Sequence, residues 1–352
     1  MNLPFGKHTF GQIGISFHDG GVTIGQCSWK DGGYSATAIR RIETNPREFT
    51  ADDWRTCICE TSTTGSDCVL SLPPSIAHHQ VLRLPNMTDL ELKEAASWEM
   101  ADRLGVERST LQMDAIPIGS GGDILAIAIE QPVLANLLDP LYAAGLRPTI
   151  IEPECVSVAR TFSLLHRRNS DLSIVRSVLD FGLNGSCFMV LAGDSLVFYK
   201  HFEHSGRSLI ESIESQTGVT SQQATKMLDC TRTSNNDNVI NKAVRDATRS
   251  THESIATDAM KCMRHYGVTN RGPLSSHTII TGSAGWNHHL ATVLSAACNQ
   301  KVLADIETKH ISELPTTVTS TNGWHVALGA SLSNINPQKQ RRANDQLLGE
   351  AA

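Results

Sequence analysis

The pattern that most constrains this chain is a set of three apolar strands separated by glycine turns, and it occurs twice. The first copy covers residues 9–42 and the second covers 174–199. Asp-Gly and Gly-Gly pairs between apolar stretches indicate hairpins, because glycine adopts positive φ at no steric cost. Although no sequence repeat accompanies the pattern, we predict two α/β lobes that share an architecture, each opening with a meander of strands.

The segment between the two meanders is predicted to mix strands and helices. Its clearest element is a helix that begins after Thr88, where Thr88 and Glu91 form a capping box, and ends near Gly105. Further helices are expected at 47–60 and 133–144, and strands at 68–72, 81–84, 111–118, 124–129 and 149–151.

The segment after the second meander is predicted to be mostly helical. Ser208 with Glu211, and Thr220 with Gln223, match the capping-box pattern. The remaining expected elements are a long helix at 239–266, strands at 278–281 and 302–303, a helix from about 287, a closing helix at 326–332 and a disordered polar tail.

Composition narrows the class of protein. The 352 residues contain 30 Lys and Arg against 36 Asp and Glu, a net charge of −6, which argues against a dedicated nucleic-acid binder. No stretch approaches the roughly 18 apolar residues that span a bilayer, and the N-terminus lacks a signal-peptide pattern. The nine cysteines are odd in number and scattered, as is typical of free thiols in a reducing compartment. We therefore expect a soluble cytoplasmic protein.

Most clusters of reactive residues favour structural roles. Cys57 and Cys59 lack the two-residue gap of zinc pairs. Adjacent histidines, at 78–79 and 288–289, cannot both point into one site from a regular strand or helix. Neither a P-loop motif nor a G-x-S-x-G elbow occurs, which argues against a standard P-loop ATPase and a serine hydrolase.

Three strand-to-turn junctions carry small residues, namely Gly14 to Gly21, Asp180 to Ser186, and Gly282 to Gly285. Glycine turns after buried strands let backbone N–H groups approach a phosphate, and an aspartate at a strand end can hold hydrated Mg²⁺. Turns between strands use Gly and Asp in any case, so no single junction is specific.

Taken in order, the junctions and several motifs resemble the actin-like ATPase superfamily. Within it they resemble the PilM family of type IV pilus assembly proteins, which are FtsA-like. The most specific match is the family pattern "lP.s", then "r.i.lP.ms..EL..av.wEa", which corresponds here to 69–73, 83–88, 91–92 and 95–100. Further matches stand at 144–148, 179–182, 218–224, 280–282 and 327–330, so the resemblance covers most of residues 10–332.

The resemblance implies an actin-like two-lobe α/β fold, with a duplicated β-sheet with helices and an inserted mixed strand-and-helix subdomain. Residues 1–75 and 145–180, with a closing helix at 325–335, would form the first lobe, and 76–144 the inserted subdomain. Residues 181–324 would form the second lobe with a helical insertion at 207–270, leaving 336–352 as a disordered tail.

The resemblance also implies a site for ATP and Mg²⁺, with Asp180 holding the metal through water. No catalytic residue is assigned. The residues expected to line the nucleotide are Gly14, Ser16, Asp180, Gly182, Ser186, Gly206, Gly282 and Gly285.

The first phosphate turn departs from the family pattern, which reads G-I-D-I-G-s-s-s-v-K. Ser16 stands in place of its aspartate and supplies no carboxylate, although Asp19 would do so after a register slip. His18 stands in place of a glycine, which removes freedom for positive φ and crowds the phosphate. Thr23 stands where a lysine is usual. We therefore expect a degraded or weak ATP site and a protein that is not an active enzyme.

By resemblance, the function is that of a cytoplasmic scaffold in a type IV pilus or related secretion machine, peripheral at the inner membrane. In that family the protein captures the cytoplasmic N-terminal segment of a PilN-like inner-membrane protein, in a groove by the inserted subdomain. Membrane association is then expected through this partner only, and no nucleic-acid partner is expected. Two alternatives stay open: an active ATPase or sugar-kinase-like enzyme on the same fold, and a filament-forming protein like FtsA or actin.

Overall fold

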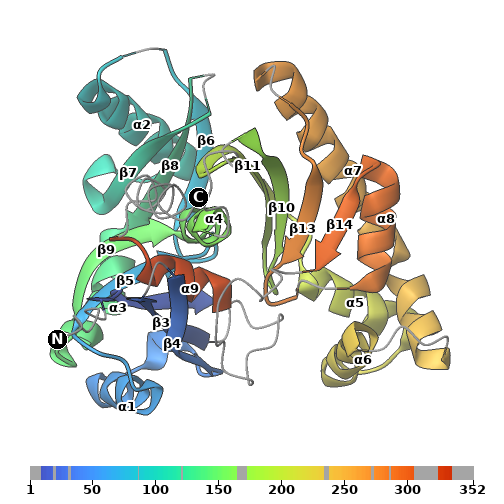
Figure 1. The fold of residues 1–352 in the computed structure, drawn as a ribbon, viewed down its shortest axis with the longest axis horizontal. Helices are drawn as coiled ribbons and strands as arrows, with labels where there is room; N and C mark the ends of the chain where they lie inside the picture. Colours follow the sequence, from blue (N-terminus) through green and yellow to red (C-terminus); the bar gives the residue numbers. More distant parts are fainter. Residues whose placement is uncertain are drawn as a thin grey trace, which may run out of the picture. The chain divides into compact units, whose positions relative to one another are not determined.

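The computed structural model describes residues 9–18, 21–30, 33–85, 87–119, 122–164, 173–233, 238–270, 273–284, 287–304 and 324–334. The chain divides into two compact units (Figure 1). The first consists of Met1–Ser173, Gly193–Leu196 and Glu307–Ala352, and the second of Ile174–Ala192 and Val197–Ile306.

The first unit is built on a six-stranded sheet with the order β1-β3-β2-β5-β9, in which β4 also pairs with β3. β2, β3 and β4 form the predicted antiparallel meander, and β2, β5 and β9 run parallel. The strands are β1 (Thr9–Phe10), β2 (Ile13–His18), β3 (Gly21–Lys30), β4 (Gly33–Ile42), β5 (Asp67–Leu72) and β9 (Arg147–Pro153).

The first apolar stretch of the predicted meander, which begins at residue 9, forms two strands, with Gly11 and Gln12 between β1 and β2. Gly11 lies directly against Ser331, so that a Cβ at Gly11 would collide with the carbonyl oxygen of Ser331. The interruption therefore reflects a close approach of the C-terminal helix, which the local sequence does not show.

Helices pack on both faces of the first sheet. Ile13, Ile15 and Phe17 of β2 share one core with Trp54 of α1 and with the apolar face of α3. The closing helix α9 packs against β2 and β3, and all eight of its residues are buried. The helices are η1 (Pro46–Glu48), α1 (Ala51–Thr61), α3 (Gln131–Ala143), α4 (Glu154–Leu164) and α9 (Trp324–Ser331).

A three-stranded antiparallel sheet with the order β6-β8-β7 follows β5 within the first unit. The helix α2 covers it through Ala96 and Met100, which pack with Leu82 and Ala126. The capping box of Thr88 and Glu91 and the left-handed Gly105 at the end of α2 are confirmed. These elements are β6 (His78–Arg83), α2 (Asp89–Leu104), η2 (Arg108–Thr110), β7 (Leu111–Ile118) and β8 (Asp123–Glu130).

The second unit repeats the plan of the first with a sheet of order β12-β11-β10-β13-β14. β10 is antiparallel to β11 and parallel to β13, as β2 is antiparallel to β3 and parallel to β5. The shared architecture predicted from the sequence is thus confirmed. The strands are β10 (Val175–Phe181), β11 (Ser186–Ala192), β12 (Ser195–Phe202), β13 (His277–Thr281) and β14 (Lys301–Ala304).

The helices of the second unit confirm one predicted start and correct another. Thr220 and Gln223 exchange the expected capping bonds. The box of Ser208 with Glu211 was wrong: α5 begins at Gly206, and the Ser208 side chain instead bonds the backbone of Ser205. The helices are α5 (Gly206–Thr217), α6 (Ser221–Thr233), α7 (Val239–Asn270) and α8 (His288–Cys298). Among the described residues, no helix combines the length and the apolar character that crossing a bilayer requires.

Candidate functional site

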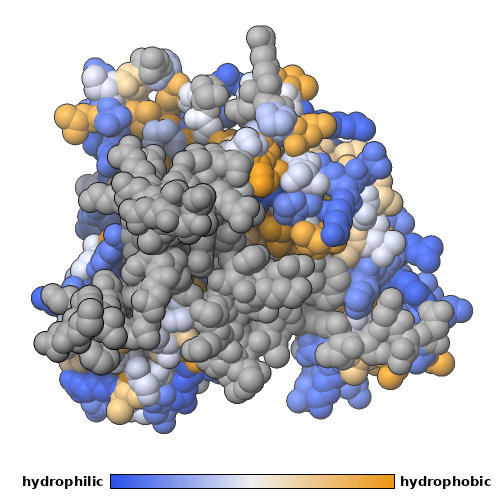
Figure 2. All heavy atoms as spheres, viewed as in Figure 1, coloured by the Kyte–Doolittle hydropathy of each residue, from blue (hydrophilic) through white to orange (hydrophobic). Residues whose placement is uncertain are grey.

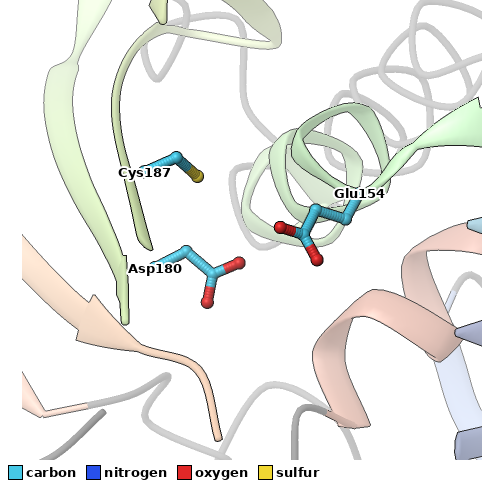
Figure 3. A group of neighbouring side chains, drawn as sticks. All are labelled: Glu154, Asp180 and Cys187. Atoms are coloured by element: carbon cyan, nitrogen blue, oxygen red, sulfur yellow. The ribbon is translucent and has the colours of Figure 1, made fainter. Parts of the chain in front are cut away.

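Asp180 occupies a buried position near the end of β10. It lies opposite Cys187 of β11 on one side and Thr281 of β13 on the other. Figure 3 shows the side chains of Asp180 and Cys187. Both project from the same face of the sheet, because the two residues lie directly opposite each other on neighbouring strands. Glu154, also labelled there, is the first residue of α4 in the first unit. Burial raises the pKa of Asp180 to about 7, and a nearby bound cation would favour the ionised form.

The turn that follows β10 is closed by backbone bonds. The Gly182 N–H donates to the Gly185 carbonyl at 2.9 Å, and a Cβ at Gly182 would lie 2.6 Å from that oxygen. The Ser186 hydroxyl donates to the His204 carbonyl, which ties the turn to the segment before α5. A residue larger than glycine at 182 would therefore open this turn.

The start of α5 is held against the same turn. The N–H groups of Gly206 and Arg207 donate to the carbonyls of Gly182 and Leu183 at 2.9 Å and 2.7 Å. A Cβ at Gly206 would lie 2.6 Å from the Cβ of Ala284, so only glycine fits there. These N–H groups, which an anion at the helix N-terminus would need, are satisfied by protein carbonyls in this structure.

Gly282 joins the cluster from the end of β13. Its φ is +99°, and a Cβ there would lie 2.5 Å from Asp180 Oδ1 and 2.6 Å from the Phe181 carbonyl oxygen. Just beyond it, the Ala284 N–H donates to the Phe181 carbonyl at 2.9 Å and the Ser283 hydroxyl accepts from the Leu183 N–H at 3.2 Å. Hydrogen bonds thus join the turn after β10, the start of α5 and the residues after β13 into one cluster, although these segments lie some twenty to a hundred positions apart in the sequence.

The second unit therefore brings together five of the eight residues expected at the nucleotide: Asp180, Gly182, Ser186, Gly206 and Gly282. Gly285 lies outside the described residues. The structure adds Arg207, whose guanidinium Nε donates to the Asn184 side chain at 2.6 Å and places a cation beside the turn. Its position directly after Gly206 was the only signal in the sequence.

The two expected residues of the first unit have a different setting. Gly14 and Ser16 lie within β2 rather than in a turn, and β2 continues to His18, which pairs with Gly21. A Cβ at Gly14 would collide with the Ala327 carbonyl oxygen of α9, so packing alone explains this glycine. Ser16 is buried opposite Thr23 in the sheet.

Comparison with known proteins rests on the fold alone. No protein-family model matches the chain, and no curated protein matches it. Among solved structures, a chain of the PilM-PilN type IV pilus biogenesis complex superposes with a TM-score of 0.70 at 18% identity, covering 93% of this chain and 99% of that chain. The fold is the actin-like one.

A second structure with this actin-like fold is the ethanolamine utilization protein EutJ from Carboxydothermus hydrogenoformans. It matches with a TM-score of 0.50 at 10% identity, over 92% of this chain and 89% of that chain. The predicted resemblance is confirmed at the level of the fold, and the higher TM-score belongs to the pilus complex.

Proposed function

We propose that this protein is a cytoplasmic scaffold of a type IV pilus or related secretion machine, peripheral at the inner membrane, that binds the cytoplasmic N-terminal segment of a PilN-like inner-membrane protein. The observation that carries the proposal is the TM-score of 0.70 over nearly the whole length of both chains with a component of a PilM-PilN complex. The family motifs at 69–73 and 83–100, found independently in the sequence, support the same assignment.

The edge strand β9 is the place where such a segment would bind. Among the described strands, β9 pairs only with β5, which leaves its other edge available. Ile150 and Ile151, in the middle of β9, are 36% and 40% exposed. An open edge with exposed apolar side chains can accept an extended peptide as an additional strand. β9 also directly follows α3, the last helix of the expected inserted subdomain.

The proposal is tested by titrating the full chain into a fluorescein-labelled synthetic peptide, the cytoplasmic N-terminal segment of a PilN-like protein from the same cell. Saturable binding is expected, weakened at least about tenfold by Ile151→Glu. The control Val239→Glu alters an exposed apolar residue of the second unit, 85% exposed, and should leave the affinity unchanged. Absence of saturable binding to the unaltered chain would contradict the scaffold role, whereas binding that Ile151→Glu does not alter would contradict only the β9 location.

We further propose that the second-unit cluster is a weak ATP site. Glycine turns around Asp180 suit a phosphate, and one carboxylate suits Mg²⁺ held through water. Two features support low affinity: the N–H groups of Gly206 and Arg207 are already bonded, and Ser16 supplies no carboxylate.

Calorimetric titration with Mg-ATP should show weak binding and no turnover. Micromolar affinity, with turnover lost in Asp180→Ala, would contradict this and favour the active ATPase or kinase-like enzyme.

A further inference from the structure

Trp98 is exposed although it belongs to the most specific motif of the sequence. Trp98 is 61% exposed, while Ala96, Ser97 and Met100 of the same helix are buried. The core of the β6-β8-β7 sheet therefore does not use it. A large exposed aromatic residue on a helix is the kind of anchor that protein interfaces favour.

A pocket of about 900 Å³ lies beside Trp98, at the C-terminal end of α2 and the short helix η2 that follows. Figure 1 shows α2 lying along the three-stranded sheet, with this end leading into β7. Val106, half-buried, gives the pocket an apolar wall next to the indole. One side of the pocket is thus formed by the aromatic Trp98 and the aliphatic Val106.

The charged residues of the pocket divide into paired and unpaired groups. The Arg108 guanidinium lies 5.1 Å from the centre of the Trp98 ring and 3.5 Å from the Glu94 carboxylate. Asp102 and Glu107 have no ion pair within the part of the chain that the structure describes, and the Glu107 carboxylate accepts a bond from the neighbouring Ser109 hydroxyl at 3.3 Å. Since a helix C-terminus carries a partial negative charge, the end of α2 adds to these two carboxylates.

We propose that this pocket docks a segment of a partner protein in which a lysine or arginine stands next to an apolar side chain. The cation would pair with Asp102 and Glu107, and the apolar side chain would cover Trp98 and Val106. The uncompensated carboxylates disfavour a nucleic acid or an anionic lipid surface at the same place. No residue of β9 lines the pocket, so it would provide a second contact besides the one proposed for the PilN-like segment.

The test selects binders from a displayed library of random 12-residue peptides on the full-length chain, then measures the best synthetic peptides by fluorescence anisotropy. The selected peptides should share a Lys or Arg beside an apolar residue. Trp98→Ala and the double variant Asp102→Asn with Glu107→Gln should each weaken binding at least about tenfold. Tyr142→Ala, which removes another exposed aromatic residue of the first unit, should not change it.

The double variant preserves side-chain shape. It therefore remains informative if a thermal melt shows that Trp98→Ala is already unfolded at the temperature of the binding assay. Three results overturn the proposal: no peptide binds saturably, the best binders lack a cationic residue, or binders retain full affinity for both pocket variants. The PilN-like segment is titrated in parallel, and its binding should survive the charge-removing double variant.

Discussion

At the scale of single residues, Gly282 combines a backbone conformation that favours glycine with close contacts at the place that a side chain would occupy. A side chain there would combine a φ of +99° with contacts of 2.5 Å to Asp180 Oδ1 and 2.6 Å to a backbone oxygen. Gly282→Ala should therefore lower the free energy of unfolding by about 3 kcal/mol or more. Gly218 also has positive φ, +69°, but nothing within 4 Å, so Gly218→Ala should lose only about 1 kcal/mol. Equal losses in urea unfolding would contradict the close packing at Gly282.

The buried carboxyl of Asp180 makes stability depend on pH. Its pKa rises from 3.8 to about 7 on folding, so the folded state holds the proton more tightly. The free energy of unfolding is unaffected by Asp180 ionisation below pH 3.8. It falls as the pH rises from 3.8 toward 7, and it stays at the lower value above pH 7. Asp180→Asn should remove this loss and stabilise the protein at pH 8 by a few kcal/mol at most, since one pKa unit corresponds to about 1.4 kcal/mol. If Asp180→Asn instead stabilised the protein more at pH 4 than at pH 8, the direction assigned to the pKa shift would be wrong.

At the scale of elements, one buried ion pair joins β9, α4 and α9. Arg160 of α4 donates to both carboxylate oxygens of Glu152 at 2.7 Å and to the Gly329 carbonyl at 2.7 Å. Arg160→Met would leave Glu152, 8% exposed, without its cation, and should lower the free energy of unfolding by about 3 kcal/mol. Arg147 pairs with Asp67 at the surface, so Arg147→Met should lose less than about 1 kcal/mol. Similar denaturation midpoints for the two variants would refute this distinction.

Element starts were predictable where the signal is local and not where it is tertiary. The capping boxes of Thr88 and Thr220 need only residues three positions away, and both are confirmed. Ser208 fits the same pattern, yet its hydroxyl bonds back to Ser205 because α5 is held against the turn after β10. Gly14 suits a phosphate turn in sequence but is required by the approach of Ala327, more than three hundred positions away.

At the scale of the whole molecule, the sequence was sufficient for the architecture and insufficient for the site. Two meanders with glycine turns predict two similar sheets, and the observed strand orders confirm them. Which turns meet is a different question, because Asp180, Gly206 and Gly282 become neighbours only through the parallel pairing of β10 with β13 and the docking of α5. The order of these residues along the chain matched a family pattern. The hydrogen bonds that occupy the N–H groups at the start of α5 could not be predicted from that pattern and are seen only in the structure.

The proposed role of this actin-like chain is that of a scaffold for a PilN-like membrane protein. Its most direct test is a titration of the full chain with the cytoplasmic N-terminal segment of that protein, alongside a scrambled peptide of the same composition. The scaffold role predicts saturable one-to-one binding of the native segment alone, with no sugar-dependent consumption of ATP in the same preparation. No difference between native and scrambled peptide, together with sugar-dependent ATP use, would contradict it and favour the enzyme.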